Sequence, residues 1–221
     1  MVKRALRADL RPIIVRFRTC HKRGCATPTT LLGMARTVTI VDYRETWPAD
    51  FQDIAAGLRS AYGPAALRID HIGSTAVPGL AAKDVIDVQV TVPSLDDTPA
   101  ALPGFEAVPY LADHPPPGFA GEPADLAKRF FRAAPGARRA HVHVREDGRF
   151  NQRYPLLCRD YLRATPAAAA AYVEVKRTLA NRFPDDRDTY ADLKDPVFDV
   201  LMAGAEAWAD ATGWTIGPAD A

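Results

Sequence analysis

Residues 71–90 read HIGSTAVPGLAAKDVIDVQV. Apolar and β-branched residues at both ends of this stretch predict two strands, joined by a turn that contains glycine and proline. The first strand ends at Gly73-Ser74, and twelve residues separate Ser74 from Asp87, a lone carboxylate in the apolar run 85–92. This spacing predicts a serine-bearing turn beside an acidic side chain on the next strand.

Such a turn has the chemistry of a phosphate site. A glycine leaving a strand lets a phosphate approach closely, and the serine that follows offers a hydroxyl and a backbone N–H to its oxygens. A carboxylate on the adjacent strand can hold Mg²⁺ or another divalent cation that bridges the phosphates. We therefore predict that Gly73 and Ser74 bind phosphate, that Asp87 binds metal, and that Ser74 and Asp87 are catalytic. A turn that binds nothing is the alternative, since Gly-Ser pairs are common.

The rest of the chain predicts a mixed sheet followed by a helical half. The expected strands span residues 37–42, 66–72, 85–92, 105–111, 128–133 and 140–144, the last two being antiparallel. The expected helices span residues 50–61, a stretch from 149, a stretch from 166 to about 183, and 187–211. The nearly continuous apolar run 85–92 favours a central strand. We predict an α+β fold with flanking helices, in which residues 34–221 form a single domain.

The first 33 residues differ in charge from the rest. They hold eight of the 28 lysines and arginines and one acid, whereas residues 34–221 hold 20 basic and 26 acidic residues. A net charge of −6 in residues 34–221 argues against nonspecific nucleic-acid binding, which needs concentrated positive charge. For residues 1–33 we favour a disordered or spurious basic extension before a start at Met34. An ordered arm and a functional tail are the alternatives.

Composition also bears on the cellular setting. No run approaches the roughly 18 uninterrupted apolar residues of a membrane span, so we expect no membrane partner. The three cysteines, Cys20, Cys25 and Cys158, give no disulfide framework. We therefore expect a cytoplasmic protein.

Histidines offer further ligands. His141 and His143 lie two residues apart in a predicted strand, so both rings point to the same face. Imidazole with carboxylate is a normal ligand set for Zn, Mn or Fe, and His71 directly precedes the Gly-Ser turn. We predict a metal or phosphate site formed by these three histidines and Asp87. The packing of one histidine inside the sheet is an equal alternative.

Four basic residues are candidate phosphate ligands: Lys83, Arg129, Lys176 and Lys194. Lys83 precedes Asp87 in the loop, and Arg129 can bind phosphate through two N–H groups. Lys176 and Lys194 each follow a tyrosine by four residues on a predicted helix, so both could face the sheet across a cleft. For each lysine, a solvated surface position is the alternative.

The stretch 71–90 resembles the polymerase-β-like nucleotidyltransferase superfamily and, more closely, the GrpB family. Later blocks resemble that family in the same order: Lys128-Arg129-Phe130, His141-Val142-His143-Val144, Arg159-Asp160-Tyr161-Leu162-Arg163, Tyr172 with Lys176, and Tyr190 with Lys194. The resemblance covers about residues 37–210 and implies a nucleotidyltransferase-like fold. Related domains are fused to dephospho-coenzyme A kinase, which implies a possible protein partner in coenzyme A metabolism.

Two positions bear on catalysis. Nucleotidyltransferases of this superfamily hold two metal ions with two or three carboxylates, but the second acid position here is Gln89, and we find no assured third acid. Asp84 stands where the family tends to have proline. It should project from the strand face opposite Asp87.

The residues support three hypotheses of function. The first is binding of a nucleotide or another phosphorylated small molecule, with metal-dependent nucleotidyl transfer as its catalytic form. The second is a noncatalytic binding or folding-partner module, which Gln89 favours. The third is a metal-dependent hydrolase that uses His141, His143 and Asp87.

Overall fold

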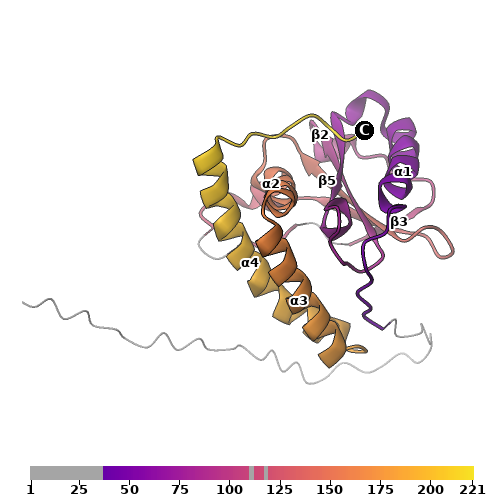
Figure 1. Ribbon diagram of the computed structural model, residues 1–221. Coiled ribbons are helices and arrows are strands. Elements are labelled where there is room, and N and C mark those ends of the chain that lie inside the picture. The colour runs from indigo at the N-terminus through magenta and orange to yellow at the C-terminus, as the bar shows by residue number, and fades with distance from the viewer. Residues whose placement is uncertain (1–36, 110–111, 117–118) are drawn as a thin grey trace, which may run out of the picture. The chain divides into compact units, whose positions relative to one another are not determined.

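The computed structural model describes residues 37–109, 112–116 and 119–221, all of which belong to one unit, Ala35–Ala221. The expectation for residues 1–33 lies outside the described residues. The described part contains a five-stranded sheet and four α-helices, which confirms the predicted α+β fold (Figure 1).

The sheet is mixed. Its strands are β1 (Arg68–Ile72), β2 (Ile86–Val92), β3 (Phe105–Val108), β4 (Arg129–Ala133) and β5 (Ala140–Glu146), in the order β1-β2-β5-β4-β3. The β2–β5 pair is parallel, and the other neighbours are antiparallel. The predicted central strand β2 is an interior strand, because it pairs with β1 and β5, but β5 takes the middle position.

The prediction of a strand at residues 37–42 is wrong. These residues form no strand, and Val41 makes only an isolated bridge with Ala82. The Val41 N–H donates to Ala82 O, and the Val38 N–H donates to Pro184 O. The segment therefore bonds to two loops, and a β-branched composition alone did not reveal this.

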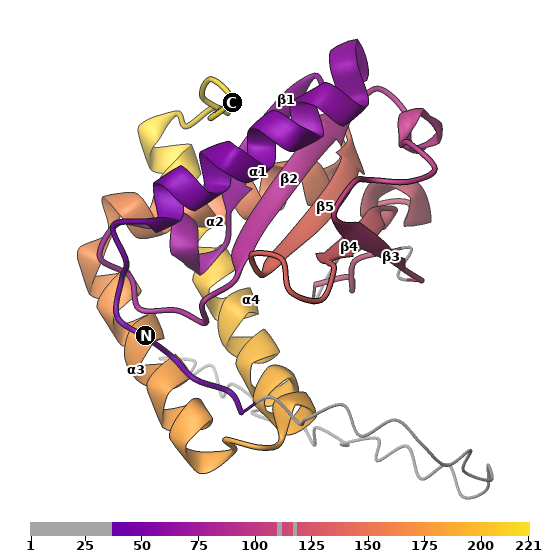
Figure 2. The same ribbon diagram turned by 90° about the vertical axis from the view of Figure 1, so that its right-hand side faces the viewer.

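Helix α1 (Trp47–Tyr62) covers one face of the sheet (Figure 2). Its buried residues recur at helical spacing: Trp47, Phe51, Ala55, Leu58 and Tyr62. They form one core with the inward residues of β1, β2 and β5. This face is filled by packed hydrocarbon.

Helices α2 (Phe150–Ala164), α3 (Pro166–Arg182) and α4 (Arg187–Thr212) form a second core on the other side of the sheet. The loop between β1 and β2 contributes Val77, Leu80 and Ala81 to this core. The turn after β1 is therefore anchored to the helical half. No helix in the described ranges has the length and apolarity needed to cross a membrane.

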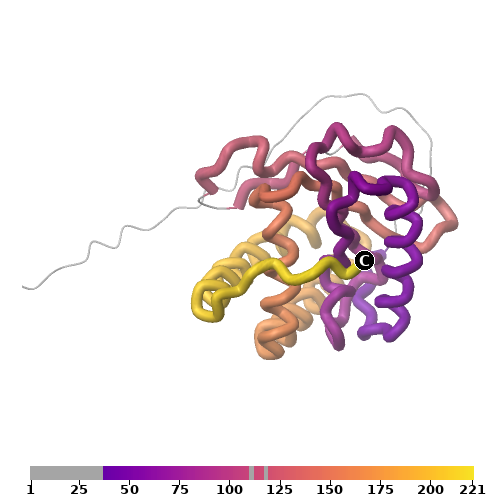
Figure 3. The backbone as a smooth tube through the Cα atoms, turned by 90° about the horizontal axis from the view of Figure 1, so that it is seen from above, coloured from indigo at the N-terminus to yellow at the C-terminus, as the bar shows by residue number. Residues whose placement is uncertain are grey.

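The segment after α4 runs across to α1 and β1 (Figure 3). The Ala221 N–H donates to Ile69 O, and the His71 N–H donates to the Asp220 carboxylate at 2.9 Å. Arg159 of α2 also donates to Asp220, at 2.6 Å. The segment thereby satisfies backbone groups on the edge of β1 that faces away from β2.

Candidate functional site

Strand register places the key side chains on one face. Asp87 of β2 stands opposite Ile72 of β1 and His141 of β5, and Gln89 stands opposite His143. Because side chains alternate along a strand, these polar residues share the face that α2 covers. The opposite face carries the α1 core.

The backbone conformation at residue 73 and its closeness to Asp87 explain why a glycine precedes Ser74. The φ of +71° at Gly73 favours glycine, and a β-carbon there would lie 2.6 Å from Asp87 Oδ2. The Asp87 carboxylate therefore occupies the space that any side chain at residue 73 would need. The predicted proximity of the Gly-Ser turn to the acid on the next strand is present.

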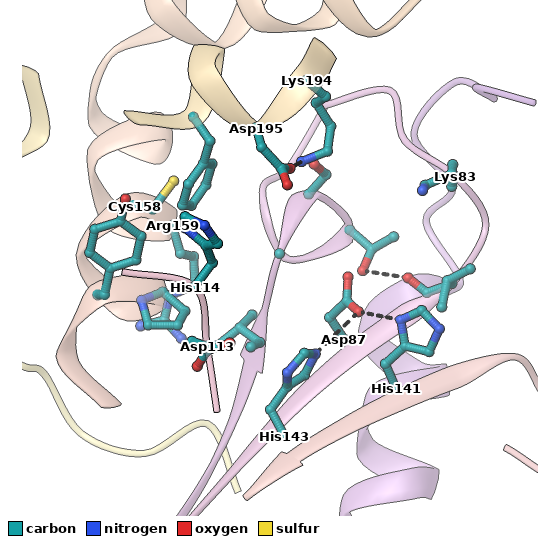
Figure 4. A pocket seen from close by; sticks show the side chains of 18 of the residues that line it. Lys83, Asp87, Asp113, His114, His141, His143, Cys158, Arg159, Lys194 and Asp195 are labelled. Atoms are coloured by element: carbon teal, nitrogen blue, oxygen red, sulfur yellow. Dashed lines mark hydrogen bonds and ion pairs between the residues drawn. The ribbon is translucent and has the colours of Figure 1, made fainter. Parts of the chain in front are cut away.

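Asp87, His141 and His143 form a cluster (Figure 4). The distance from His141 Nδ1 to Asp87 Oδ1 is 3.1 Å, and that from His143 Nε2 to the same oxygen is 3.9 Å. One ligand atom from each residue lies within 4.8 Å of the others. Two imidazoles and a carboxylate suit Zn, Mn or Fe in donor type, more than they suit Mg²⁺, which prefers oxygen ligands.

Burial and hydrogen bonding have opposite effects on the pKa of Asp87. Burial alone would raise the pKa of Asp87, but the hydrogen bond with His141 and the nearby His143 ring outweigh it and hold the pKa below its ordinary value. Burial lowers the pKa of His143 to about 4, aided by the charges of Arg145 and Lys128. Asp87 is therefore ionised and His143 neutral at neutral pH.

Lys128 contacts the His143 ring at the nitrogen that does not face Asp87. Its Nζ is 3.4 Å from His143 Nδ1 and also contacts Asp113. An ammonium can only donate, so this contact places the proton of neutral His143 on Nε2, the nitrogen facing Asp87. A metal-bound histidine instead donates its far N–H to an acceptor. The cluster thus fits a cation in donor type and spacing, provided that the Lys128–His143 contact breaks.

Asp113, between β3 and β4, is held by cations. It accepts from Arg145 Nε and Nη2 at 3.0 and 2.9 Å, and from Lys128. Burial would raise the pKa of Asp113, but Arg145 and Lys128 outweigh it and hold the pKa below its ordinary value. Asp113 is a second carboxylate in the cavity, already neutralised by its partners.

Gln89 is committed to structural bonds. Its side chain is fully buried, donates to Gln152 O at 2.9 Å and accepts from Arg145 at 2.8 Å. This neutral amide links β2, β5 and α2. The residue at the position of the expected second acid therefore makes structural hydrogen bonds here.

The predicted inclusion of His71 in the cluster is wrong. His71 lies on the α1 face, where its ring stacks on Phe51 with centroids 4.8 Å apart. Its Nε2 lies 3.0 Å from Thr75 Oγ1, and burial lowers its pKa to about 4. Strand alternation sends its ring to the face opposite Asp87.

A cavity of about 750 Å³ lies between the polar face of the sheet and the helices. Most of the predicted site residues line it: Gly73, Ser74, Lys83, Asp87, His141, His143, Lys176 and Lys194. The other charged side chains in its walls are Asp113, Arg132, Arg139, Arg145, Arg159, Arg187, Asp195 and Asp199. The basic side chains outnumber the carboxylates, which suits an anionic ligand.

Lys176 of α3 contacts the Gly-Ser turn. Its Nζ donates to Ser74 Oγ at 3.0 Å and to Ala81 O at 2.6 Å, and lies 4.6 Å from the centre of the Tyr172 ring. Burial lowers the pKa of Lys176 to about 7, and repulsion from Lys194 and Lys83 adds to this. The lysine is 3% exposed.

Two further lysines, Lys83 and Lys194, line the cavity (Figure 4). Lys83 Nζ lies 4.9 Å from the centre of the Tyr190 ring, and burial lowers its pKa, followed by repulsion from Arg187. Lys194 pairs with Asp195 at 3.0 Å. As predicted, α3 and α4 aim their lysines toward the sheet.

Arg129 does not reach this cavity, so its prediction as a phosphate ligand is not supported. It alternates with Phe130 along β4, and Phe130 packs 4.8 Å from the His143 ring on the polar face. Arg129 therefore lies on the other face. Arg132 and Arg139 line the cavity in its place.

The sequence did not single out Asp113, Lys128 or Arg145. Asp113 lies in a loop rich in proline, whose path across the sheet no local pattern shows. Arg145 follows His141 and His143 at the same two-residue spacing, and this period could have revealed it. Lys128 directly precedes Arg129, the residue predicted as a ligand, and belongs to the same block 128–130.

A family model described as GrpB protein matches residues 37–203. The chain belongs to the GrpB family. A solved structure titled crystal structure of conserved protein GrpB from Enterococcus faecalis is 30% identical, with a TM-score of 0.63. The match covers 77% of this chain and 99% of that one. The GrpB resemblance seen in the sequence is confirmed.

Two curated relatives of this chain carry different names. A protein named dephospho-CoA kinase from Mycolicibacterium paratuberculosis is 40% identical over 195 residues, covering 80% of this chain and 48% of that protein. UPF0157 protein YqkA from Bacillus subtilis is 34% identical over 173 residues, covering 78% of this chain and 48% of that protein. The chain spans about half the length of these two relatives.

Proposed function

We propose that this protein binds a nucleotide or another phosphorylated small molecule in the cavity, and that nucleotidyl transfer is its reaction. In this proposal the phosphates lie among Ser74, Lys83, Lys176 and Lys194. A divalent cation held by Asp87, His141 and His143 supplies further positive charge to the phosphate oxygens.

One observation carries the proposal: three lysines line the same cavity as the Gly-Ser turn, and two of them have little charge compensation. Among the described residues, Lys83 and Lys176 form no ion pair, and the pKa of each is lowered by burial and by neighbouring cations. Like charges gathered in a cavity of about 750 Å³ repel one another. A ligand that carries several phosphate charges would relieve this repulsion.

Calorimetric titration tests the proposal. The panel contains the four common nucleoside triphosphates and dephospho-coenzyme A, each with and without Mn²⁺. Dephospho-coenzyme A is included because the name of several relatives is dephospho-CoA kinase. We expect binding by at least one member, weakened roughly tenfold or more by Lys83→Met, since each charge-assisted bond contributes about 1.5–3 kcal/mol.

Arg182→Met is the matched control. It removes an exposed cation from the last turn of α3, outside the cavity, and should leave the affinity unchanged. Absence of heat from every ligand while the protein is folded would contradict the proposal.

Gln89 favours a second candidate, a noncatalytic module that assists a protein partner in coenzyme A metabolism. With a neutral amide at the second acid position, the two-metal arrangement is incomplete. An Asp87→Ala variant separates the candidates. Loss of metal-dependent ligand binding supports the first, whereas unchanged partner binding without any detectable reaction supports the second.

The two histidines favour a third candidate, a metal-dependent hydrolase centred on Asp87, His141 and His143. Such an enzyme needs a resident transition metal. Metal analysis of protein purified without a histidine tag distinguishes it. Stoichiometric Zn or Fe supports a hydrolase, and metal that binds only together with a nucleotide supports the first candidate.

A further inference from the structure

The contact between Lys176 and Ser74 joins a hydroxyl to a base candidate. The two atoms are 3.0 Å apart, within the range for proton transfer. Ser74 is half-buried and lines the cavity, so its hydroxyl can meet a ligand. Lys176 is fixed by Ala81 O on one side and by the Tyr172 ring on another.

We propose that Ser74 is a nucleophile toward phosphorus and that Lys176 is the base that takes its proton. This inference rests on the proposed function and deepens it, because it assigns a covalent nucleotidyl-serine intermediate to the same cavity. Serine is a weak nucleophile unless a neighbouring base activates it, and a deprotonated lysine can be that base.

The identity of residue 89 favours such a base. In two-metal enzymes a metal ion activates the attacking oxygen, and that arrangement needs more carboxylates than Asp87 alone. Gln89 is neutral and bonded to Arg145 and Gln152, while Asp113 is bonded to Arg145 and Lys128. The Ser74–Lys176 pair supplies the activation that neither of these side chains can give.

The proposed step conserves atoms and electrons. Ser74 Oγ attacks the α-phosphorus of a nucleoside triphosphate, and an oxygen–phosphorus bond forms. The bond from phosphorus to the bridging oxygen of the leaving group breaks, pyrophosphate departs with the electron pair, and the serine proton moves to Lys176 Nζ. Attack by an acceptor hydroxyl then releases Ser74, which regains the proton from Lys176, and the acceptor's proton passes to solvent.

Lys176 is available as a base near neutral pH. Its pKa of about 7 follows from burial and from nearby cations. The titratable and charged groups that act on it come from the loop before β2, from α2, from its own helix and from α4: Lys83, Cys158, Tyr172, Arg177 and Lys194. Without a bound phosphate, Lys176 is therefore substantially deprotonated at pH 8, the state in which the probe below meets it.

A fluorophosphonate probe tests the pair on the full chain and does not require the substrate to be identified. Attack by Ser74 forms an oxygen–phosphorus bond and expels fluoride, and the adduct is mapped by mass spectrometry. We expect selective labelling of Ser74 at a rate that rises with pH through about 7. Lys176→Met should slow the labelling by roughly 100-fold, the lower range for loss of a general base.

Two variants control the result. Arg182→Met removes an exposed cation from the last turn of the same helix, outside the cavity, and should keep the labelling rate within about twofold. Lys176→Arg keeps the positive charge but cannot act as a base, so it should not restore labelling. Circular dichroism and thermal melting confirm that each variant is folded.

The proposal is overturned if folded wild-type protein is not labelled at Ser74 faster than at Ser60, or if the rate has no pH dependence near 7. The wild-type measurements decide this even if the variants fail to fold. Calorimetric binding of nucleotides without labelling of Ser74 rejects the nucleophile and keeps the binding function. Labelling of Ser74 without nucleotide binding keeps the nucleophile and rejects the nucleotide-binding function.

Discussion

The carboxylate of Asp87 lies against the backbone of Gly73, so closely that a β-carbon on residue 73 would stand 2.6 Å from Asp87 Oδ2. The two residues belong to the β1–β2 pair, in which Ile72 stands opposite Asp87. The turn and the acid are therefore one structural unit. A substitution at either residue should therefore displace the other.

Replacing Gly73 with alanine tests this relationship. The φ of +71° is strained for alanine, and the added carbon meets the carboxylate. We expect Gly73→Ala to lower the free energy of unfolding by about 1–3 kcal/mol, the usual cost of one strained backbone position. It should also displace Asp87 and weaken Mn²⁺ binding. Urea denaturation and metal titration measure the two effects.

Gly57→Ala is the matched control. Gly57 lies inside α1, and a β-carbon there meets nothing within 4 Å. Alanine at this helical position should raise the free energy of unfolding by up to about 1 kcal/mol. Equal stability of the two variants would mean that the Gly73–Asp87 contact is not tight.

The sequence predicted the fold well where local patterns repeat. The apolar run of β2 and the helical spacing in α1 placed both elements within a few residues of their observed ends. Residues 37–42 looked like a strand, but a strand needs a partner, and pairing is decided by tertiary contacts.

The site was harder to predict, because it depends on which face each side chain takes. Residue alternation placed His141 and His143 together, but the faces of His71 and Arg129 relative to Asp87 depend on the strand register, with His71 opposite Val88 and Arg129 opposite Val144. Lys176 meets Ser74 across 102 positions of sequence, a contact that helix packing alone creates. No local pattern encodes such a contact.

Asp113 should be more important for stability than its place in a loop indicates. It compensates two buried cations, Arg145 and Lys128, whose side chains are 5% and 4% exposed. Asp113→Asn would remove the carboxylate charge that these two cations share. Breaking a buried pair costs about 3–5 kcal/mol, and partial exposure of Asp113 reduces our expectation to roughly 2 kcal/mol.

Asp42→Asn provides the comparison for Asp113. It breaks an ion pair with Arg177 in which the carboxylate is 90% exposed. Such pairs contribute about 0–1 kcal/mol. Urea denaturation of both variants should give clearly different losses, and similar losses would show that Asp113 is not the main counter-ion of the network.

Lys176 should make stability depend on pH. Its pKa falls from 10.5 to about 7 on folding, so between these values the unfolded chain holds a proton that the folded chain lacks. Stability contributed by this group therefore rises with pH across that window, by at most about 1.4 kcal/mol per pH unit. The stability of Lys176→Met should lack this rise.

The measurement compares wild type and Lys176→Met by urea denaturation from pH 7 to pH 9. This range lies below the raised pKa of the buried tyrosines, such as Tyr172. Lys83 and Lys128 remain in both proteins, so the difference between the two curves isolates Lys176. Parallel curves would mean that Lys176 keeps its proton throughout.

Lys128 should oppose metal binding through His143. Its ammonium faces His143 Nδ1 at 3.4 Å, where a metal-bound histidine needs an acceptor. In Lys128→Gln, the amide oxygen can accept from Nδ1 while the amide N–H groups still donate to Asp113. We expect this variant to bind Mn²⁺ or Zn²⁺ about tenfold more tightly, the lower range for outer ligand contacts.

Arg129→Gln is the control for this experiment. It changes the adjacent residue in the same way, but Arg129 lies on the other face of β4. Titration with Zn²⁺ against a competing chelator should show an unchanged constant for this variant. If Lys128→Gln binds metal no more tightly than wild type, the Lys128 contact does not limit the histidine, and the cluster is ready for a cation without rearrangement.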